Sequence, residues 1–487
     1  MYALTDLEPK AVMHWFEEIS SIPRGSLKEE KIAAYIMEFA RQRGLSCSED
    51  AYHNVLVRKP ASPGREQSPA LILQAHTDMI CAKEKGVEHD FEREGLELYV
   101  EGDRIRARGT TLGADDGIGV AYQLAILDDE TMEHPAIEAV FTTAEEIGMV
   151  GASHFDMTQL TGKRMISFDA GGFTEGRIYV GCAGNQHGSL TQQLTFLPCR
   201  QAGSAVKITL SGLLGGHSGG DIGKGRGNGS VILGRLLSLL LADDTLEIVR
   251  FESGDISQEN KNGIPAECNV VVCTAALQPL QEKLVAFEAV LRDELSDVDD
   301  GVRLTAEPYS ASVGRVLSRD SAAAAARILT LLPNGVQSMQ RVFPDTPECS
   351  CNIGNIEMED ASVVYYLSIR SCKESLMDAV CEKYKAVAAA TGSQLTLGRR
   401  LPSWDYDKNS RMRQLVEAEY RKEFGAAPRF KVTHASTECS LFKTNEPEMD
   451  IISMGPIIYE EHTPNEYMGI ESVGVLWTFL RNIIKQL

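Results

Sequence analysis

LILQAHTDM, residues 71–79, joins a buried-strand pattern to two side chains suited to a metal site. The apolar run from Leu71 to Gln74 predicts a strand, and His76 then emerges at its carboxyl end, where open α/β sheets bind their ligands. Asp78 lies two residues further on, so in an extended segment it shares a face with His76 and can orient the imidazole. The stretch predicts an α/β fold with a functional site at the edge of its sheet.

Four other short motifs supply the side chains that such a site needs. They are TTLGADDGIG at 110–119 with Asp115, FTTAEEIGM at 141–149 with Glu145 and Glu146, SFDAGG at 167–172 with Asp169, and EEHTPNE at 460–466 with His462. Each is weak evidence alone, because a lone histidine or aspartate usually serves the interior or the backbone. Together they provide ligands that Zn²⁺ takes, in a site whose two ions lie about 3.5–4 Å apart. Because adjacent side chains point apart, one of the two glutamates can ligate while the other acts as a base.

The composition describes a large globular chain. Its 487 residues exceed the usual limit of one core, so we expect two or three domains. The net charge of −21 argues against nucleic acid or an anionic membrane surface as a partner. The 11 cysteines include no CxxC pair, which favours reduced thiols in a cytoplasmic protein. Neither a signal peptide nor a run of 18 apolar residues is present, so no membrane span is expected.

The pattern of elements predicts a discontinuous catalytic domain. Residues 1–185 alternate helix and strand patterns in the manner of a doubly wound, mostly parallel sheet. Strands are predicted at 54–58, 71–74, 137–143 and 165–168, with helices at 27–44 and 117–129. The last segment, 401–487, carries His462 and must return to this domain if that residue joins the site.

The middle of the chain, 186–400, is predicted to be an inserted α+β domain with two repeats of about 96 residues. AVKITLSG near Val206 recurs as GVRLTAEP near Val302, and SVILGRLLSLLL corresponds to SAAAAARILTLL. IPAECNVVVCTA likewise corresponds to DASVVYYLSIRS, and LQEKLVAFEAVLRDEL to ESLMDAVCEKYKAVAAATG.

The motifs HTD, GADDG, AEEIG, FDAG and HTP resemble those of the M20 family of dinuclear zinc peptidases. The strings GCAG, GGHSGGDI, GRGN, HASTEC and ISMGPIIYEEHTPNE are similar to those of its cytosolic Xaa-His (aminoacyl-histidine) dipeptidase branch, and the resemblance covers essentially the whole chain. It implies a zinc-peptidase α/β domain interrupted by a lid domain. The implied metal ligands are His76, Asp115, Glu146, Asp169 and His462, with Asp115 bridging the ions.

The resemblance also implies a reaction. A metal-activated water would attack the peptide carbonyl with Glu145 as general base, while Asp78 supports the site. The implied cofactor is two Zn²⁺ per chain, with Co²⁺ or Mn²⁺ as substitutes. Asp116 remains the rival to Asp115 as the bridge, although a capping role before the following helix is simpler for it. The implied substrates are short unblocked peptides, above all Xaa-His dipeptides such as β-Ala-His (carnosine), and a homodimer is compatible with this reading.

Four residues beyond the ligand set match substrate-binding positions of the family. His217 of GGHSGG matches a lid histidine that stabilises the oxyanion, and Asn262 of NGIP and Arg370 of LSIRS match residues that bind the substrate's backbone or carboxylate. Glu438 in HASTECSLF is the fourth, although the family string there is closer to HAGLECG. A loop histidine or an edge arginine could equally be structural.

Three alternatives stay open. Residues 216–220, GHSGG, match the GxSxG elbow of serine hydrolases, but neither a strand directly before nor a helix directly after is predicted. Another M20 activity, that of a tripeptidase or an N-acyl amino acid amidohydrolase, would use the same ligands. The third alternative is a binding protein whose catalytic site has decayed.

Overall fold

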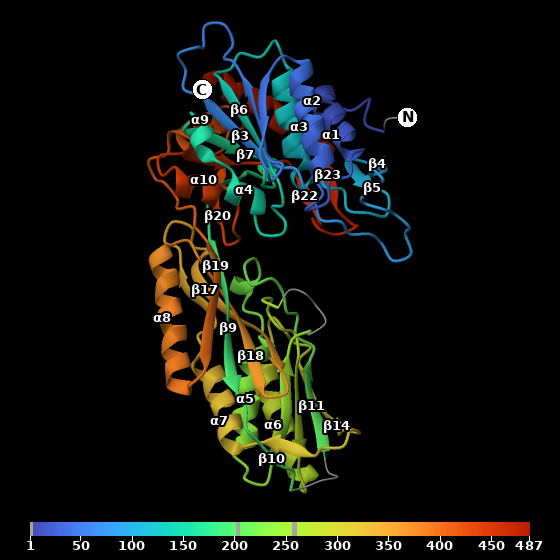
Figure 1. Cartoon of the computed structure of the whole chain (residues 1–487), viewed down its shortest axis with the longest axis vertical. Helices are drawn as coiled ribbons and strands as arrows, with labels where there is room; N and C mark the ends of the chain where they lie inside the picture. The colour runs from blue at the N-terminus through green and yellow to red at the C-terminus, as the bar shows by residue number, and fades with distance from the viewer. Residues whose placement is uncertain (1–2, 201–204, 256–260) are drawn as a thin grey trace. The chain divides into compact units, whose positions relative to one another are not determined.

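The computed structural model describes residues 3–200, 205–255 and 261–487, which form two compact units (Figure 1). Unit 1 comprises Met1–Cys182, Trp404–Thr433 and Thr437–Leu487, and unit 2 comprises Ala183–Ser403 and His434–Ser436. The boundaries predicted after 185 and 400 each lie three residues from these. His434–Ser436 was expected with the first domain but packs with unit 2, where the His434 ring contacts Ser350.

Unit 1 is built on an eight-stranded sheet in the order β1-β2-β6-β3-β7-β21-β8-β20. The strands are β1 (Ser46–Glu49), β2 (Val55–Lys59), β3 (Leu71–His76), β6 (Ile137–Thr142), β7 (Arg164–Ser167), β8 (Arg177–Cys182), β20 (Arg429–Thr433) and β21 (Asp450–Ser453). The central strands β6, β3, β7 and β21 run parallel, whereas β1 and β2 are antiparallel. The predicted α/β class is therefore confirmed, with an antiparallel edge that the strand patterns did not specify.

Helices cover this sheet, so its central strands are buried on both faces. The helices of unit 1 are α1 (Lys10–Ser20), α2 (Glu30–Gln42), α3 (Ala114–Asp128), α4 (Val150–His154), α9 (Arg411–Phe424), α10 (Cys439–Asn445) and α11 (Ile470–Gln486). Every residue of β3 and β6 is buried, as expected for parallel strands between helical layers. Helix α3 packs on β3, and its residues from Asp116 to Leu127 are all buried. This packing fixes the sheet edge at which β3 and β6 end.

A small antiparallel sheet in unit 1 holds the last predicted motif. Its strands are β4 (Leu98–Glu101), β5 (Arg104–Ala107), β22 (Ile458–Tyr459) and β23 (Tyr467–Gly469), in the order β22-β23-β5-β4. Strands β22 and β23 pair as a hairpin, and Met468 pairs with Ile105. The connecting loop, residues 460–466, is therefore anchored at both ends.

Unit 2 is a nine-stranded antiparallel sheet with four helices (Figure 1). The sheet order is β14-β11-β13-β12-β17-β18-β9-β19, with β16 beside β17, and β10 pairs separately with β15. The strands are β9 (Gly184–Gln193), β10 (Phe196–Pro198), β11 (Ala205–Ser211), β12 (Glu247–Ser253), β13 (Cys268–Cys273), β14 (Arg303–Pro308), β15 (Arg315–Leu317), β16 (Gly335–Met339), β17 (Pro347–Met358), β18 (Ser362–Ser371) and β19 (Gln394–Leu401). The helices are α5 (Gly229–Leu241), α6 (Leu277–Glu294), α7 (Arg319–Leu331) and α8 (Glu374–Thr391).

The sheet order differs from one of the predicted repeat matches. The sequence matches β11 with β14, but these two strands pair with each other at one edge. The two halves of the sheet correspond when strands are counted inward from its two edges: β14 with β19, β11 with β9, β13 with β18, and β12 with β17. The strand equivalent to β11 is therefore β9. Short alternating strands share one pattern, so sequence similarity alone could not distinguish neighbour from counterpart.

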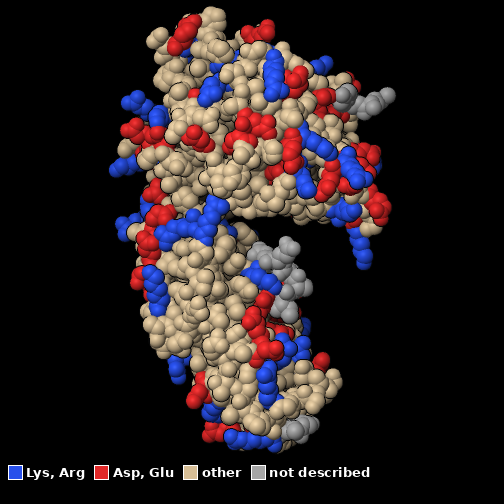
Figure 2. Space-filling view, in the orientation of Figure 1, with Lys and Arg blue, Asp and Glu red and all other residues tan. Residues whose placement is uncertain are grey.

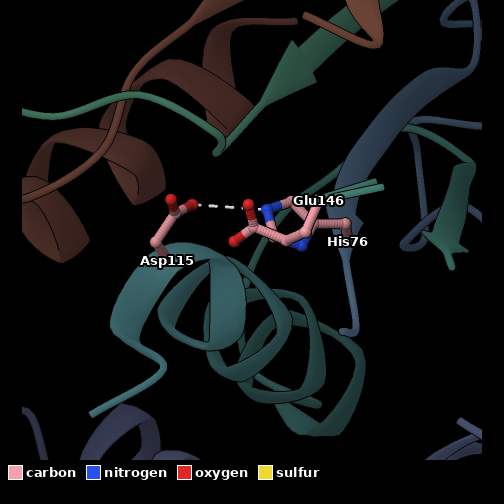
Figure 3. Close-up of side chains that lie close together, drawn as sticks. All are labelled: His76, Asp115 and Glu146. Carbon is pink, nitrogen blue, oxygen red and sulfur yellow. Dashed lines mark hydrogen bonds and ion pairs between the residues drawn. The ribbon is translucent and has the colours of Figure 1, made fainter. Parts of the chain in front are cut away.

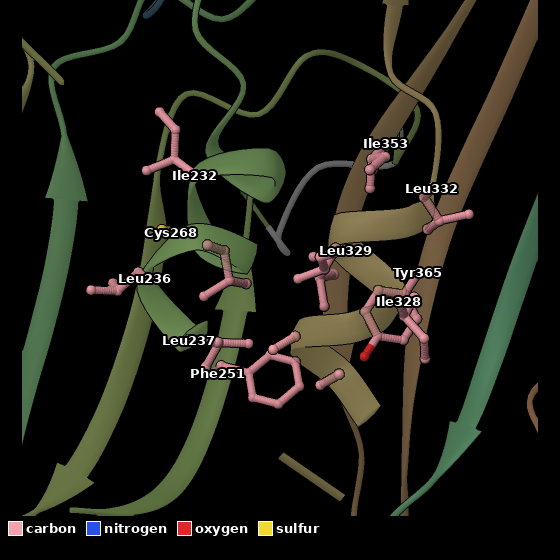
Figure 4. Close-up of a cluster of buried hydrophobic side chains, with 14 of the residues drawn as sticks. Ile232, Leu236, Leu237, Phe251, Cys268, Ile328, Leu329, Leu332, Ile353 and Tyr365 are labelled. Atoms are coloured by element: carbon pink, nitrogen blue, oxygen red, sulfur yellow. The ribbon is translucent and has the colours of Figure 1, made fainter. Parts of the chain in front are cut away.

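The core of unit 2 lies between its helices and its sheet. Figure 4 shows Leu236 and Leu237 of α5, Leu329 of α7, Phe251 of β12 and Tyr365 of β18 in one apolar cluster. Helices α5 and α7 pack against each other. Burial of these large apolar side chains is the main source of stability for such a layer, at about 25 cal/mol per Å².

Charged side chains are spread over the surface, and the helices are short or polar. Acidic and basic side chains are interspersed over the face of each unit shown in Figure 2. Within the part of the chain that the structure describes, every helix is too short or too polar to cross a membrane. All 11 cysteines are free thiols.

Candidate metal centre

Three predicted ligands meet at the carboxyl edge of the unit 1 sheet. His76 ends β3, Asp115 lies in the first turn of α3, and Glu146 follows β6 in a loop. One possible ligand atom from each lies within 4.8 Å of the others (Figure 3). Because β3 and β6 are parallel neighbours, their ends bring His76 and Glu146 to the same edge.

Asp115 lies between two imidazoles. His76 Nε2 is 3.2 Å from Asp115 Oδ1, and His462 Nε2 is 3.2 Å from Asp115 Oδ2. His462 Nε2 is also 3.0 Å from Glu146 Oε2. The two carboxylate oxygens thus point to two different histidines, which is the arrangement expected of a bridging ligand. The loop at 460–466 brings His462 to this cluster from the far end of the sequence.

Asp116, the other candidate for the bridge, is turned into the protein. It is 1% exposed, and burial raises its pKa well above the usual value. The predicted capping role is wrong, because the N-cap of α3 is Gly113 and Asp116 lies inside the helix. The geometry therefore favours Asp115 over Asp116 as the shared ligand.

Asp169 follows β7, and its carboxyl group interacts electrostatically with the same cluster. Ser453 Oγ donates to its carbonyl oxygen at 3.1 Å, which fixes the backbone there. Burial and then the charge of Asp115 raise the pKa of Asp169 to about 7. The contacts with Asp115 and Glu146 raise the pKa of His462 to about 11. Both shifts reflect crowded carboxylates that nearby positive charge would stabilise.

His76, Asp115 and Glu146 are placed to hold a divalent cation. The predicted set combines two imidazoles with carboxylates, the donors that Zn²⁺ takes. Glu146 Oε1 is buried and has no hydrogen-bond partner among the described residues, so it is available for a cation. Carboxylates this close repel each other, and bound cations would remove that repulsion.

Asp78 connects the first ligand to the glutamate loop. Its Oδ1 is 3.4 Å from His76 Nδ1 and accepts from Glu145 N at 3.0 Å, and its Oδ2 accepts from Glu146 N at 3.3 Å. Burial alone would raise the pKa of Asp78, but its contacts with His76, Glu145 N and Ser26 together outweigh this and leave the pKa below the usual range. Asp78 thus contacts both the imidazole, for which the sequence predicts an orienting role, and the backbone of the glutamate pair, which the sequence does not predict.

Glu145 differs from its neighbour in its surroundings. Its backbone is held by Asp78, whereas its carboxyl group makes none of the ion pairs to histidine that Glu146 makes. Burial, and then the negative charge of Asp169, raise the pKa of Glu145 well above its usual value. A carboxyl group with a raised pKa is suited to holding and releasing a proton near neutral pH.

Glu438, predicted to contact substrate, is placed differently. It is 1% exposed and accepts hydrogen bonds from Gln74 Nε2 at 2.7 Å and from Thr142 Oγ1 at 2.5 Å. Burial raises its pKa to about 8. Gln74 and Thr142 belong to the two strands that carry the ligands, so Glu438 supports those strands from the interior and does not reach a surface that a substrate could contact.

In unit 2, His217 and Arg370 lie together. Arg370 Nη2 is 3.3 Å from His217 Nε2, and His217 Nδ1 accepts from the backbone N–H groups of Gly219 and Gly220 at 3.3 and 3.1 Å. Position 219 suits glycine, because a Cβ there would lie only 3.0 Å from Arg370 Nε. A guanidinium can only donate, so the contact with Arg370 uses His217 Nε2 as the acceptor. Arg370 directs its remaining donors into the same space, which suits an oxygen acceptor.

Asn262 and His434 also belong to unit 2. The Asn262 carbonyl accepts from Asn352 Nδ2 at 3.0 Å, which fixes its loop. His434 is 6% exposed, and its Nε2 is 2.7 Å from Ser350 Oγ. Burial, followed by the positive charge of Arg370, lowers the pKa of His434 to about 3.

His434 makes stability depend on pH in a defined direction. Because its folded pKa of about 3 lies below the unfolded value, the unfolded chain binds an extra proton between pH 6.5 and 3. Its contribution is therefore present above pH 6.5 and is lost as the pH falls, by about 1.4 kcal/mol per pH unit. In thermal unfolding of metal-free protein between pH 6.5 and 4.5, His434→Gln should lose stability less steeply than wild type. The exposed His14→Gln is the control, and equal slopes for wild type and His434→Gln would contradict the assignment.

The serine-hydrolase alternative does not fit the structure. Strand β11 ends at Ser211 and α5 begins at Gly229, so Ser218 lies on neither a strand end nor a helix start. The motif lacks the strand-turn-helix setting that exposes a nucleophilic serine.

Three buried charged residues contact the segments that carry the predicted ligands and are not predicted from the sequence: Arg24, Glu29 and Glu466. Glu29 accepts from Ala144 N at 2.7 Å, next to the glutamate pair. Glu466 and Arg24 contact the turn before Asp115. Glu466 ends the EEHTPNE motif, which is a usable signal, whereas nothing around Arg24 in sequence indicates its contacts.

The profile of peptidase family M20/M25/M40 matches residues 72–486. A cytosol non-specific dipeptidase of Escherichia coli (strain K12) is 35% identical over 491 aligned residues, covering 100% of this chain and 99% of that protein. The crystal structure of an aminoacylhistidine dipeptidase from Vibrio alginolyticus matches with a TM-score of 0.88 at 33% identity, over 99% of this chain and 98% of that one. A tripeptidase from Staphylococcus aureus subsp. aureus Mu50 shares the fold, with a TM-score of 0.60 at 16% identity over 99% and 98% of the two chains.

Proposed function

The chain belongs to peptidase family M20/M25/M40, and from this premise we propose that it is a metal-dependent dipeptidase that hydrolyses unblocked dipeptides, Xaa-His dipeptides among them. One observation carries the proposal: Asp115 offers its two oxygens to His76 and His462, while Glu146 lies beside them. Two relatives of nearly full length, named as dipeptidases, support the substrate class.

The proposed cofactor is a pair of Zn²⁺ ions, with Co²⁺ or Mn²⁺ as substitutes. His76, Asp115, Glu146, Asp169 and His462 would hold them. When bound, such ions polarise the peptide carbonyl and make a water molecule acidic. Asp78 keeps the His76 imidazole oriented through Nδ1, so that Nε2 faces the site.

Glu145 is the proposed proton carrier. Its carboxylate accepts a proton from the attacking water as the water oxygen bonds to the carbonyl carbon. It then donates that proton to the amide nitrogen, so that the C–N bond breaks and the amine leaves. The raised pKa of Glu145 supports this role, because the group must hold the proton between the two steps.

Three residues of unit 2 are proposed to bind polar groups of the substrate. The Arg370 guanidinium presents donors that suit the terminal carboxylate, and His217, which Arg370 contacts, is proposed to stabilise the carbonyl oxygen as it gains charge. Arg370 is 8% exposed, and burial lowers its pKa to about 10, which still leaves it cationic at neutral pH. Asn262, held through its carbonyl, is proposed to bind the substrate backbone.

We place the enzyme in the cytoplasm. The free thiols of this chain suit a reducing compartment, and the Escherichia coli relative is named a cytosol enzyme. A short peptide is the proposed partner, and a homodimer is compatible with the proposal.

Amine release from a panel of substrates tests the function. Zinc-loaded protein should cleave β-Ala-His, Ala-His and Ala-Ala, fastest where histidine is carboxyl-terminal. A tripeptide, an N-acetyl amino acid and N-acetyl-Ala-His should remain intact; the last differs from Ala-His only in its blocked amine. Cleavage of the blocked or longer compounds at comparable rates would reassign the chain to another M20 activity. Absence of all cleavage would favour a decayed site.

A further inference from the structure

Glu466 holds the turn that carries Asp115. The residue is 2% exposed and ends the loop that presents His462. Oε2 accepts from Leu112 N at 2.8 Å and Gly113 N at 2.9 Å, and Oε1 accepts from Ala114 N at 2.8 Å and from Asp115 N at 3.4 Å. Both oxygens are occupied by backbone N–H groups, so Glu466 is not placed as a ligand itself.

Arg24 contacts the same turn as a hydrogen-bond donor, whereas Glu466 contacts it as an acceptor. Its buried guanidinium donates to the carbonyl of Gly113 through Nη2 at 2.6 Å, and to Thr77 O through Nη1 at 3.1 Å. Thr77 lies directly after His76. Arg24 therefore connects the β3 loop, which carries His76 and Asp78, to the turn that carries Asp115.

Gly113 is the point at which the two contacts meet. Its N–H is bonded by Glu466 and its carbonyl by Arg24. Its φ of 63° lies in the left-handed region, and a Cβ there would lie 2.6 Å from Arg24 Nη2. Glu466 is also the strongest of the nearby charges that favour the ionised form of Arg24 against its burial.

We propose that Arg24 and Glu466 are positioning residues of the metal centre, a buried and oppositely charged pair that fixes Asp115 relative to His76. This inference rests on the proposed function in assuming that those two residues bind metal. Neither residue touches the reacting atoms. Partners that orient ligands in this way typically change metal affinity by about 10–100-fold when they are replaced.

The test compares Glu466→Gln with Glu138→Gln. Glu138 is a matched control, because it is 4% exposed and also accepts backbone N–H bonds, from Thr161 and Gly162, at the start of β6. A glutamine retains the shape but turns an N–H₂ group toward backbone donors, so both variants should lower the Tm of metal-free protein. Only Glu466→Gln should weaken zinc affinity, by about 10–100-fold in competition with a chelator, and alter the visible absorption of the Co²⁺-loaded protein.

Equal zinc affinity in Glu466→Gln and wild type, or an equal loss in both glutamine variants, would overturn the proposal. If Glu466→Gln does not fold, Arg24→Lys serves instead, since it keeps the charge but lacks the planar fork that reaches both the Gly113 and Thr77 carbonyls. It should likewise weaken zinc binding. Because affinity is read without a peptide substrate, a failed dipeptidase assay leaves this test intact, whereas failure of wild type to bind zinc would sink both ideas.

Discussion

Replacing Glu145 by glutamine should lower kcat for dipeptide hydrolysis by about 10²–10⁴-fold while bound zinc is retained. The amide has the shape of the carboxylate but cannot accept a proton from water. The backbone bond from Glu145 N to Asp78 does not depend on the side chain, so the loop should stay in place. Steady-state kinetics of Ala-His cleavage, with zinc counted in the same sample, measure both effects.

The neighbouring carboxylate provides the matched comparison. Glu146 Oε2 contacts His462, and Oε1 is buried without a partner among the described residues. Glu146→Gln should therefore lose zinc, and with it activity. If Glu145→Gln lost zinc while Glu146→Gln kept it, the two roles would be the reverse of those assigned. A Glu145→Gln enzyme with kcat near that of wild type would remove Glu145 from the mechanism.

Asp115→Ala should abolish hydrolysis, and excess zinc should not restore it. Two cations about 3.5–4 Å apart repel each other strongly, and a shared carboxylate offsets that repulsion. Without Asp115, both His76 and His462 also lose the oxygen that each contacts at 3.2 Å. The expected loss of kcat/KM is at least about 10³-fold, which is no smaller than the typical loss on removing one proton-transfer group.

Asp128→Ala is the control for this substitution, because Asp128 ends the same helix and is exposed. It should leave kcat/KM unchanged. Recovery of Asp115→Ala to within tenfold of wild type on addition of zinc would contradict the bridging assignment and return Asp116 to consideration.

Much of the site could be predicted because its ligands lie at the ends of strongly patterned strands. The apolar run of β3 identifies His76 as a sheet-edge residue, and Asp78 follows from the period of two along an extended chain. The other ligands came from short motifs and from family resemblance. Glu438 stands in such a motif too, yet it is buried among strand side chains. A motif identifies a residue without saying which way its side chain points.

The remainder depends on contacts between distant segments. Glu466 meets backbone N–H groups more than 350 positions earlier in the chain, and Arg24 meets main-chain carbonyls that have no sequence signature. The match between β9 and β11 likewise depends on strand pairing. One repeat, residues 205–308, lies between β9 and the remaining elements of the other repeat, which begin at α7. Strand patterns reveal burial but do not specify partners.

A zinc titration of metal-stripped wild-type protein, read simultaneously as bound metal and as Ala-His hydrolysis, tests the metal-dependent mechanism most directly. We expect no hydrolysis without metal and full activity when two zinc ions are bound per chain, with Asp115→Ala failing to reach that occupancy. Hydrolysis that persists in the stripped protein, or that is complete without any bound zinc, cobalt or manganese, would contradict that mechanism.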